Sequence, residues 1–394
     1  MTETFYIEVG SAQRNHLDER ICGDMFISEK LKEEGRTVVV LSDGMGHGVK
    51  ANLLATLTAT MALNFTKEHK DAHKIAEIIM NTLPVCSERK ISYATFTIVD
   101  IEEDGQCTIL NYDNPDPVIV RDGNMLNPEW QHISIKAEGN QEREILACSF
   151  KGLKEDRILL MSDGVTQSGL GKGKYLLGWG SDNVEKYFNE IINDQPGISA
   201  SRLASMVVNK AHSNDGYQAK DDTSTAVIYF REPRRLLLCS GPPYEKSKDG
   251  ELAATVKNFR GKKILCGGTT ADIVSRELDI PIRDTLEFED PDLPPVSYMD
   301  NIELVTEGIL TLSKTAEILD KYNQSTQLGK GPADLIVRQL LESDEIHLLT
   351  GTAINVAHQD PNLPVELEIR RTVMKRIVRI LEEKFLKTVS LRYI

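Results

Sequence analysis

Two apolar segments of this chain end in the same three residues, and this repetition restricts the folds that the chain can adopt. The segments are VVVLSDG, which ends at Gly44, and ILLMSDG, which ends at Gly164. Each is a short run of aliphatic residues, which is typical of a buried strand. An acidic side chain at the end of such a strand needs a partner, because an unpaired charge is costly to bury. Since strand ends converge at one edge of a sheet, the two acidic ends are expected to meet.

Two further aspartates have similar surroundings. Asp24 follows a glycine at a predicted strand start, and Asp221 lies just before the predicted strand STAVIYF. Clustered carboxylates repel unless protons or cations neutralise them, and divalent cations prefer oxygen ligands. Asp24, Asp43, Asp163 and Asp221 are therefore candidate metal ligands, and the glycine after each Ser-Asp allows a sharp turn that exposes a carbonyl. An Asp-Gly pair is also a common turn, which is the alternative for any single one.

Composition indicates a globular chain with room for two domains, since it has 394 residues and 40% apolar content. The net charge of -14 argues against binding to nucleic acid or an anionic membrane. No stretch approaches the roughly 20 apolar residues of a membrane span, and the first residues do not resemble a signal peptide. The six cysteines form no CxxC pair, which favours reduced thiols. We therefore expect a cytoplasmic protein.

The order of predicted elements changes once along the chain, at REPRR (231–235). Before it, many strands are interrupted by two helical pairs, which predicts an α+β layered sandwich. After it, strands and helices alternate, which predicts an α/β domain with a mostly parallel sheet. The predicted domains are therefore residues 1–232 and 233–394.

Two helices carry specific expectations. Residues 49–65 are predicted to form a core helix. Its apolar positions at helical spacing are Val49, Leu53, Leu54, Leu57, Met61 and Phe65. The closing helix, VELEIRRTVMKRIVRILEEKF, carries a basic face that we interpret as solvated or facing the other domain. Its basic residues are Arg370, Arg371, Lys375, Arg376 and Arg379.

Five segments together resemble a known family. CGDMF, SDGMGHG followed by KANLLA, LLMSDGV and DDTST occur in the order of the motifs of magnesium/manganese-dependent serine/threonine protein phosphatases. The bacterial branch typified by stage II sporulation protein E is the most similar. The resemblance covers about residues 1–230. It implies a phosphatase-type β-sandwich flanked by helices (α-β-β-α) with two Mn²⁺ or Mg²⁺ ions at one edge.

The resemblance also implies roles for the acidic residues. Asp43 would bridge the two metals, and the Gly44 carbonyl would ligate one of them. Asp163 and Asp221 would hold the first metal, and Asp24 would serve the second largely through water. These aspartates would be the catalytic residues, and a metal-activated water would attack phosphorus directly.

Several positions depart from the family pattern or are weaker candidates. Animal members have a histidine directly after Asp-Gly, where this chain has Met45, and His47 lies two residues further on. Arg20 is the candidate for binding the substrate phosphate, as an arginine does in animal members. Asp222 is the weakest candidate among the acidic residues.

The function implied is a hydrolase that removes phosphate from phosphoserine or phosphothreonine on a bacterial signalling protein, such as an anti-sigma-factor antagonist. Two alternatives stay open. One is a catalytically silent module that keeps the phosphatase fold for regulatory binding. The other is a metal-dependent phosphoesterase for small molecules.

The second domain has small residues at four predicted strand ends. The candidate ligand-binding residues are Gly267, Gly268, Thr269, Gly308 and Gly351. Open α/β sheets bind ligands beyond the carboxyl ends of their strands, and helix N-termini favour anions. A small anionic ligand that regulates the phosphatase is one interpretation; tight turns with threonine caps and a second catalytic site are the others. The segment INVAHQDPNLP is a predicted loop that would cover such a site.

Overall fold

The computed structural model divides into two compact units, Met1–Glu232 (unit 1) and Pro233–Ile394 (unit 2). The residues it describes are 5–31, 33–68, 71–82, 94–137, 141–171, 175–285, 288–323, 326–353, 365–385 and 387–394. Among them, no helix has both the length and the apolar character needed to cross a membrane.

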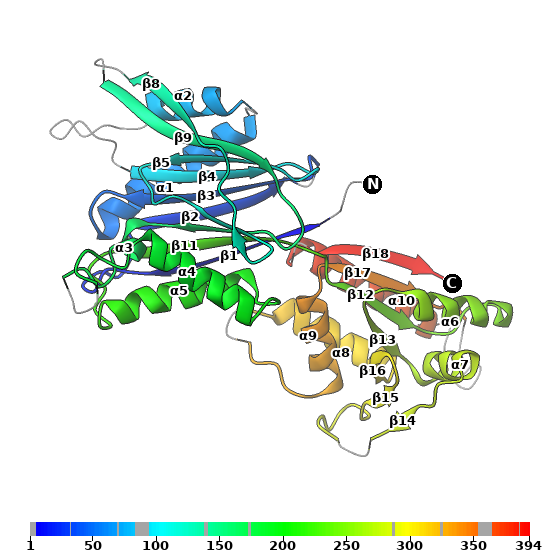
Figure 1. Cartoon of the computed structure of the whole chain (residues 1–394). Coiled ribbons are helices and arrows are strands. Elements are labelled where there is room, and N and C mark those ends of the chain that lie inside the picture. Colours follow the sequence, from blue (N-terminus) through cyan, green and yellow to red (C-terminus); the bar gives the residue numbers. More distant parts are fainter. Residues whose placement is uncertain are drawn as a thin grey trace. The chain divides into compact units, whose positions relative to one another are not determined.

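Unit 1 is built on two antiparallel sheets that pack face to face (Figure 1). The first has, in spatial order, β2 (Asp24–Leu31), β3 (Arg36–Gly44), β4 (Ala94–Ile101), β5 (Gln106–Tyr112), β9 (Gln141–Lys151) and β8 (Gln131–Ala137). The second has β1 (Tyr6–Arg14), β11 (Thr223–Arg231), β10 (Arg157–Met161), β6 (Val118–Arg121) and β7 (Asn124–Met125). Val39 and Ile109 of the first sheet share one buried cluster with Ile158 and Ile228 of the second.

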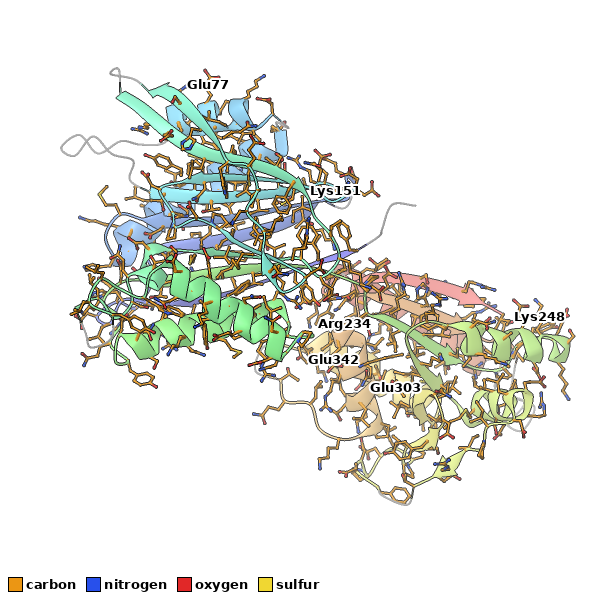
Figure 2. The ribbon with its side chains drawn as sticks, viewed as in Figure 1. Glu77, Lys151, Arg234, Lys248, Glu303 and Glu342 are labelled. Atoms are coloured by element: carbon orange, nitrogen blue, oxygen red, sulfur yellow. The ribbon has the colours of Figure 1, made fainter. Side chains whose placement is uncertain are left out.

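Helices cover the outer face of each sheet in unit 1. The first sheet carries α1 (Gly48–Glu68) and α2 (Ala72–Thr82), and the second carries α3 (Asp163–Thr166), α4 (Ser181–Asp194) and α5 (Ala200–Asn214). Four layers result, helix, sheet, sheet and helix, as Figure 1 shows. Charged side chains such as Glu77 on α2 and Lys151 on β9 lie on the outside (Figure 2). The predicted α-β-β-α sandwich is confirmed.

The first helix exists as predicted, but its predicted core face is wrong. Val49, Leu53 and Leu57 are 66%, 68% and 46% exposed. The buried residues are mostly small: Gly48, Ala51, Ala55, Thr58, Ala59, Ala62, Leu63 and Thr66. The physical reason is the close approach of α1 to the sheet, which favours small residues over most of that side; Leu63 is the one large residue in the list.

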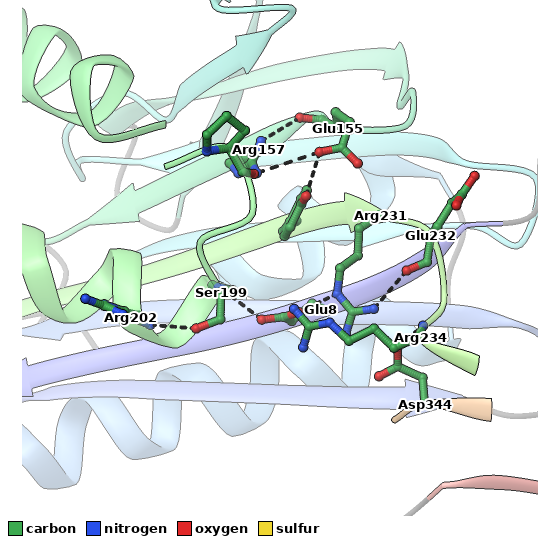
Figure 3. Close-up of polar contacts among 12 residues, drawn as sticks. Glu8, Glu155, Arg157, Ser199, Arg202, Arg231, Glu232, Arg234 and Asp344 are labelled. Carbon is green, nitrogen blue, oxygen red and sulfur yellow. Dashed lines mark hydrogen bonds and ion pairs between the residues drawn. The ribbon is translucent and has the colours of Figure 1, made fainter. Parts of the chain in front are cut away.

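A polar cluster stabilises one end of the pairing between β1 and β11 in unit 1 (Figure 3). Glu8 on β1 accepts hydrogen bonds from the Arg231 guanidinium and from the Ala200 N–H at the start of α5. Nearby, the Tyr229 hydroxyl donates to Glu155 at 2.6 Å. These bonds join the sheet to its helix at the end where β11 finishes, remote from the acidic residues that precede β11.

Unit 2 contains a mixed sheet that is mostly parallel, as predicted. In spatial order its strands are β14 (Arg283–Asp284), β15 (Ser297–Met299), β16 (Ile302–Thr306), β13 (Lys262–Cys266), β12 (Arg235–Ser240), β17 (Glu345–Thr350) and β18 (Thr388–Tyr393). The five from β16 to β18 are parallel, while β14 and β15 form an antiparallel edge. Among the parallel strands, β12, β13 and β16 follow one another outward, and the chain then returns to β17 on the other side of β12.

Helices lie on both faces of this sheet. One face carries η1 (Lys246–Lys248), α6 (Asp249–Asn258) and α7 (Gly268–Leu278), and the other carries α8 (Ile309–Lys321), α9 (Pro332–Glu342) and α10 (Val365–Glu383). Lys248, Glu303 and Glu342 occupy exposed positions around the unit (Figure 2). The two apolar clusters that face the helices make unit 2 a three-layer α/β structure.

Candidate metal centre

The pairing of β2 with β3 places two of the predicted ligands directly opposite each other. In this antiparallel ladder Asp24 is the register partner of Asp43. Opposite residues project from the same face with Cβ atoms about 4.5–5.5 Å apart, and like charges there repel. An ionised pair at this position therefore needs a positive partner.

The second sheet supplies the other two predicted ligands. Asp163 is the first residue of α3, directly after β10 and Ser162, and Asp221 precedes β11 by two residues. The Ser162 N–H donates to the Ser224 carbonyl at 3.0 Å, and the Ser224 N–H donates to the Ser162 hydroxyl at 2.9 Å. These two bonds fix the ends of β10 and β11 side by side. Asp163 thus starts a short helix, whereas the sequence predicts it at a strand end.

The raised pKa values indicate that the four carboxyl groups lie near one another. Burial, followed by the charges of Asp24, Asp163 and Asp221, raises the pKa of Asp43 to about 10. Burial raises the pKa of Asp24 to about 7, and burial together with the Asp163 charge raises the pKa of Asp221 to about 6. Burial also raises the pKa of Asp163, whose Oδ2 accepts a 2.7 Å hydrogen bond from Gln167. Residues from both sheets therefore form one acidic cluster.

Buried oxygens without partners test whether this cluster suits a cation. Asp24 is 2% exposed, and neither of its carboxylate oxygens has a hydrogen-bond partner among the described residues. Asp222 is equally buried; its Oδ1 accepts from the His16 N–H at 3.0 Å, and its Oδ2 has no partner in the described part of the chain. Buried acceptors without a hydrogen-bond partner lower the free energy of unfolding unless a cation binds them. The all-oxygen donor set fits Mg²⁺ or Mn²⁺.

The carboxylates do not form a complete ligand shell by themselves. Within the described ranges, no group of three or more His, Cys, Asp or Glu side chains is close enough to hold an ion. An ion here would therefore take water or backbone oxygens beside the carboxylates, as divalent magnesium commonly does. The buried Asp222, ranked last by sequence, is the residue that sequence reasoning undervalued; its only signal was its place beside Asp221.

Glycine is required after the two Ser-Asp pairs, but for a reason other than the predicted sharp turn. Neither Gly44 nor Gly164 has a positive φ. A Cβ atom on Gly44 would lie 2.1 Å from the Ala51 carbonyl oxygen of α1, and one on Gly164 would lie 2.1 Å from the Asp222 carbonyl oxygen. Glycine is thus required at both positions because another backbone segment approaches closely.

The remaining candidates of unit 1 lie in the loop regions around the cluster. Arg20 is exposed, and its side chain has no hydrogen bond or ion pair with the described residues. The His47 side chain is 54% exposed, its Nδ1 lies 2.8 Å from a Glu19 carboxylate oxygen, and its ring stacks on His16. A catalytic role for Arg20 or His47 stays a prediction.

In unit 2, four of the five predicted ligand-binding residues come together. Gly267, Gly268, Thr269 and Gly308 line one cavity of about 600 Å³. Gly351 is not among its lining residues; a Cβ there would lie 2.2 Å from the Gly241 carbonyl oxygen, so it serves close backbone packing. The predicted covering segment INVAHQDPNLP lies outside the described residues.

One basic residue of the closing helix is also placed differently from the prediction. Arg370 is 8% exposed and lines the same cavity, although the sequence predicts it on a solvated or interdomain face. Its Nη1 donates to the carbonyl oxygens of Gly351 and Ala353, each at 3.4 Å. These backbone acceptors, which the helical pattern does not reveal, draw the side chain inward.

Comparisons with known proteins identify the family. The family Stage II sporulation protein E (SpoIIE) matches residues 33–231. The chain belongs to this family, whose members are metal-dependent phosphatases. The matched range contains Asp43, Asp163 and Asp221, and it begins after Asp24.

The solved structures that are similar to this chain have low sequence identity to it. The phosphatase domain of SpoIIE from Bacillus subtilis is 15% identical, with a TM-score of 0.43 over 58% of this chain and 94% of that chain. A Mycobacterium tuberculosis protein with RsbU and RsbW domains is 16% identical, with a TM-score of 0.46 over 64% of this chain and 68% of that one. RsbX, solved in complex with magnesium, is 16% identical, with a TM-score of 0.40 and coverage of 57% and 95%. No curated protein matches the chain.

The raised pKa values predict how pH affects the metal-free protein. Asp24 and Asp221 have folded pKa values of about 7 and about 6, above the value of about 4 expected in an unfolded chain. Their contribution to stability is complete below the unfolded pKa and is lost as pH rises through the folded pKa. The melting temperature of the chelated protein should therefore fall between about pH 4 and pH 7. Mn²⁺ should restore it, and the fall should be smaller in Asp24→Asn; equal pH profiles for both proteins would contradict the assignment.

Proposed function

We propose that unit 1 hydrolyses phosphoserine or phosphothreonine on a bacterial signalling protein with the help of two Mn²⁺ or Mg²⁺ ions. The observation that carries this proposal is the cross-strand pair of Asp24 and Asp43. In this pair the oxygens of Asp24 are buried without a partner among the described residues, and the pKa values of both carboxyls are raised, in a member of a phosphatase family. Without cations, such carboxyls would stay protonated and neutral at physiological pH, whereas bound cations would stabilise their charged form.

The chain's own residues prepare the site in this proposal. Asp43, Asp163 and Asp221 would hold the ions together with the Gly44 carbonyl, and Asp24 would act largely through water. When bound, the ions supply Lewis acidity, which lowers the pKa of a water molecule so that it can attack phosphorus. The protein contributes positioning: Gln167 orients Asp163 through a 2.7 Å hydrogen bond, and the paired Ser162 and Ser224 backbones hold the second sheet's acidic ends in place.

The space beside the cluster favours a phosphorylated side chain over a larger free ligand. A cavity of about 200 Å³ is lined by Gly164, Gln167, Lys220 and Asp221, among other residues. Sites for small molecules usually occupy about 300–1,000 Å³. A phosphoserine that enters from a protein surface would fill the smaller space. A phosphorylated anti-sigma-factor antagonist, suggested by the family resemblance, is the substrate to test first.

The proposed function can be tested by three rate measurements on the full chain. Hydrolysis of an aryl phosphate should depend on Mn²⁺ and stop with a chelator. A phosphoserine peptide should then be hydrolysed faster than a free nucleotide at equal concentration. Metal binding without hydrolysis of any of these compounds would favour the silent regulatory module, and faster hydrolysis of the nucleotide would favour a small-molecule phosphoesterase.

We also propose that unit 1 is an independent catalytic domain and that unit 2 regulates it. A fragment of residues 1–232 should fold cooperatively and retain metal-dependent hydrolysis, because its buried clusters are made within unit 1. Circular dichroism during thermal unfolding and the aryl phosphate assay would check both points. A soluble fragment without a cooperative transition would show that the two units stabilise each other.

A further inference from the structure

The cavity of about 600 Å³ in unit 2 lies at the carboxyl ends of β12, β13 and β16. Its size is that of a small-molecule site. The strand order reverses between β12 and β17, and ligands of open α/β sheets bind outside the strand ends at such a reversal. The loop after β12 reads Ser-Gly-Pro-Pro, so it lacks the glycine spacing that binds a dinucleotide. The location is therefore that of a ligand site, but for a smaller ligand.

The start of α7 presents backbone donors to this cavity. The first N–H groups of a helix have no partner within the helix, and the N-cap residue of α7 is Gly267, which has no side chain to cap them. Among the described residues, no atom would lie within 4 Å of a Cβ on Gly268, so their backbone and side chains leave room for a close approach. The neighbouring start of α8 differs, because Glu307 Oε2 accepts the Thr311 N–H at 3.3 Å. An anion would thus bind at α7 rather than at α8.

A buried hydroxyl is an independent indication that this cavity binds a polar ligand. Ser240, at the end of β12, lines the cavity and is only 1% exposed. Its Oγ has no hydrogen-bond partner among the residues that the structure describes. Leaving a buried hydroxyl unpaired costs free energy that a bound polar group would recover. The hydroxyl is therefore placed to contact a ligand.

A buried guanidinium completes the donor set. Arg370 of α10 lines the cavity and is 8% exposed. It lies against Gly241, where φ is +86° and a Cβ would be 2.6 Å from the Arg370 Nη1, so the glycine leaves room for the guanidinium. Arginine in such a position favours oxyanions. Among the described lining residues, Glu307 is the only acidic one, and it would accept from ligand hydroxyls.

We propose that this cavity binds a small organic phosphate, with the phosphate between the start of α7, Arg370 and Ser240 and with sugar-type hydroxyls toward Glu307. Three different donors line one cavity, which suits the three terminal oxygens of a phosphate monoester better than the two oxygens of a carboxylate. Ribose 5-phosphate combines a phosphate with hydroxyl groups and is a suitable first probe. The proposal is independent of catalysis in unit 1.

Calorimetric titration of the full chain tests the proposal. A chelator is present throughout, because it prevents phosphate from binding through metals at the acidic cluster of unit 1. Ribose 5-phosphate should bind saturably, inorganic phosphate more weakly, and ribose not at all. Absence of saturable binding of ribose 5-phosphate up to ~10 mM, a limit of about 3 kcal/mol of binding free energy, would overturn the proposal. Equal affinity for ribose would also overturn it.

Two variants locate the binding. Gly268→Val should fold, because its side chain has open space, and it should weaken binding at least tenfold by filling that space. Gly250→Val, at an open position in α6, is the matched control and should bind normally. Ser240→Ala should leave the ligand-free melting temperature unchanged or higher, since the lost hydroxyl has no partner, yet weaken binding roughly tenfold. Unchanged affinity in both Gly268→Val and Ser240→Ala would place the ligand elsewhere.

Discussion

Asp43→Asn is expected to lower metal-dependent phosphate hydrolysis by roughly 100-fold or more, because even residues that only support a metal ligand change activity about 10–100-fold. The carboxylate stands opposite Asp24 and feels the charges of Asp163 and Asp221. Its proposed place is between the two ions. Loss of its charge weakens the binding of both ions and raises the pKa of the attacking water.

The same substitution should not unfold the protein. Because the raised pKa of Asp43, about 10, keeps its carboxyl protonated near neutral pH without metal, Asn replaces one neutral group by another, and the metal-free variant should melt at the same temperature as the wild type or higher. The rise in melting temperature that Mn²⁺ causes in the wild type should be much smaller in the variant. Asp194→Asn, an exposed position at the end of α4, should keep both activity and the metal response. Wild-type turnover in a folded Asp43→Asn protein would end the metal-centre assignment.

The acidic residues of the candidate site could be proposed from sequence alone because their pattern is local. A strand that ends in Ser-Asp-Gly is visible in seven residues, and two copies suffice to suggest a shared edge. The register of β2 against β3, which makes Asp24 and Asp43 direct neighbours, depends on pairing along the whole ladder. Likewise, Asp222 is buried by groups brought from the other end of unit 1, such as the His16 N–H, 206 positions away.

In the fold, too, elements with a local sequence pattern were predictable, whereas features that depend on distant contacts were not. Long periodic segments such as α4 and α5 were predictable, whereas the β8–β9 hairpin was not. In β8 the only large apolar residues are Ile133 and Ile135, and the first four residues of β9 are polar or charged. The inward face of α1 was misassigned because large side chains dominate a periodicity count. Small residues such as Ala51 and Ala55 make the actual contact with the sheet.

Gly44→Ala is expected to lower the melting temperature of unit 1 by roughly 5–10 °C, since overpacking costs about 1–3 kcal/mol or more and each kcal/mol shifts a domain of this size by about 2–4 °C. The new Cβ would lie 2.1 Å from the Ala51 carbonyl oxygen and 2.6 Å from its carbon. Both are backbone atoms of α1, so no side chain can rotate away. Either α1 or the end of β3 must move.

That movement should also reach the metal centre, because Gly44 directly follows Asp43 and contributes a proposed carbonyl ligand. Gly44→Ala should therefore reduce the Mn²⁺-induced rise in melting temperature as well as the metal-free stability. Gly197→Ala is the matched control: its Cβ would meet nothing within 4 Å and its φ is not positive. It should be neutral or slightly stabilising, as an unstrained Gly→Ala change restricts the unfolded chain. If Gly44→Ala had the same melting temperature and the same Mn²⁺-induced rise as Gly197→Ala, the close packing of α1 against the end of β3 would not be needed to position the metal centre.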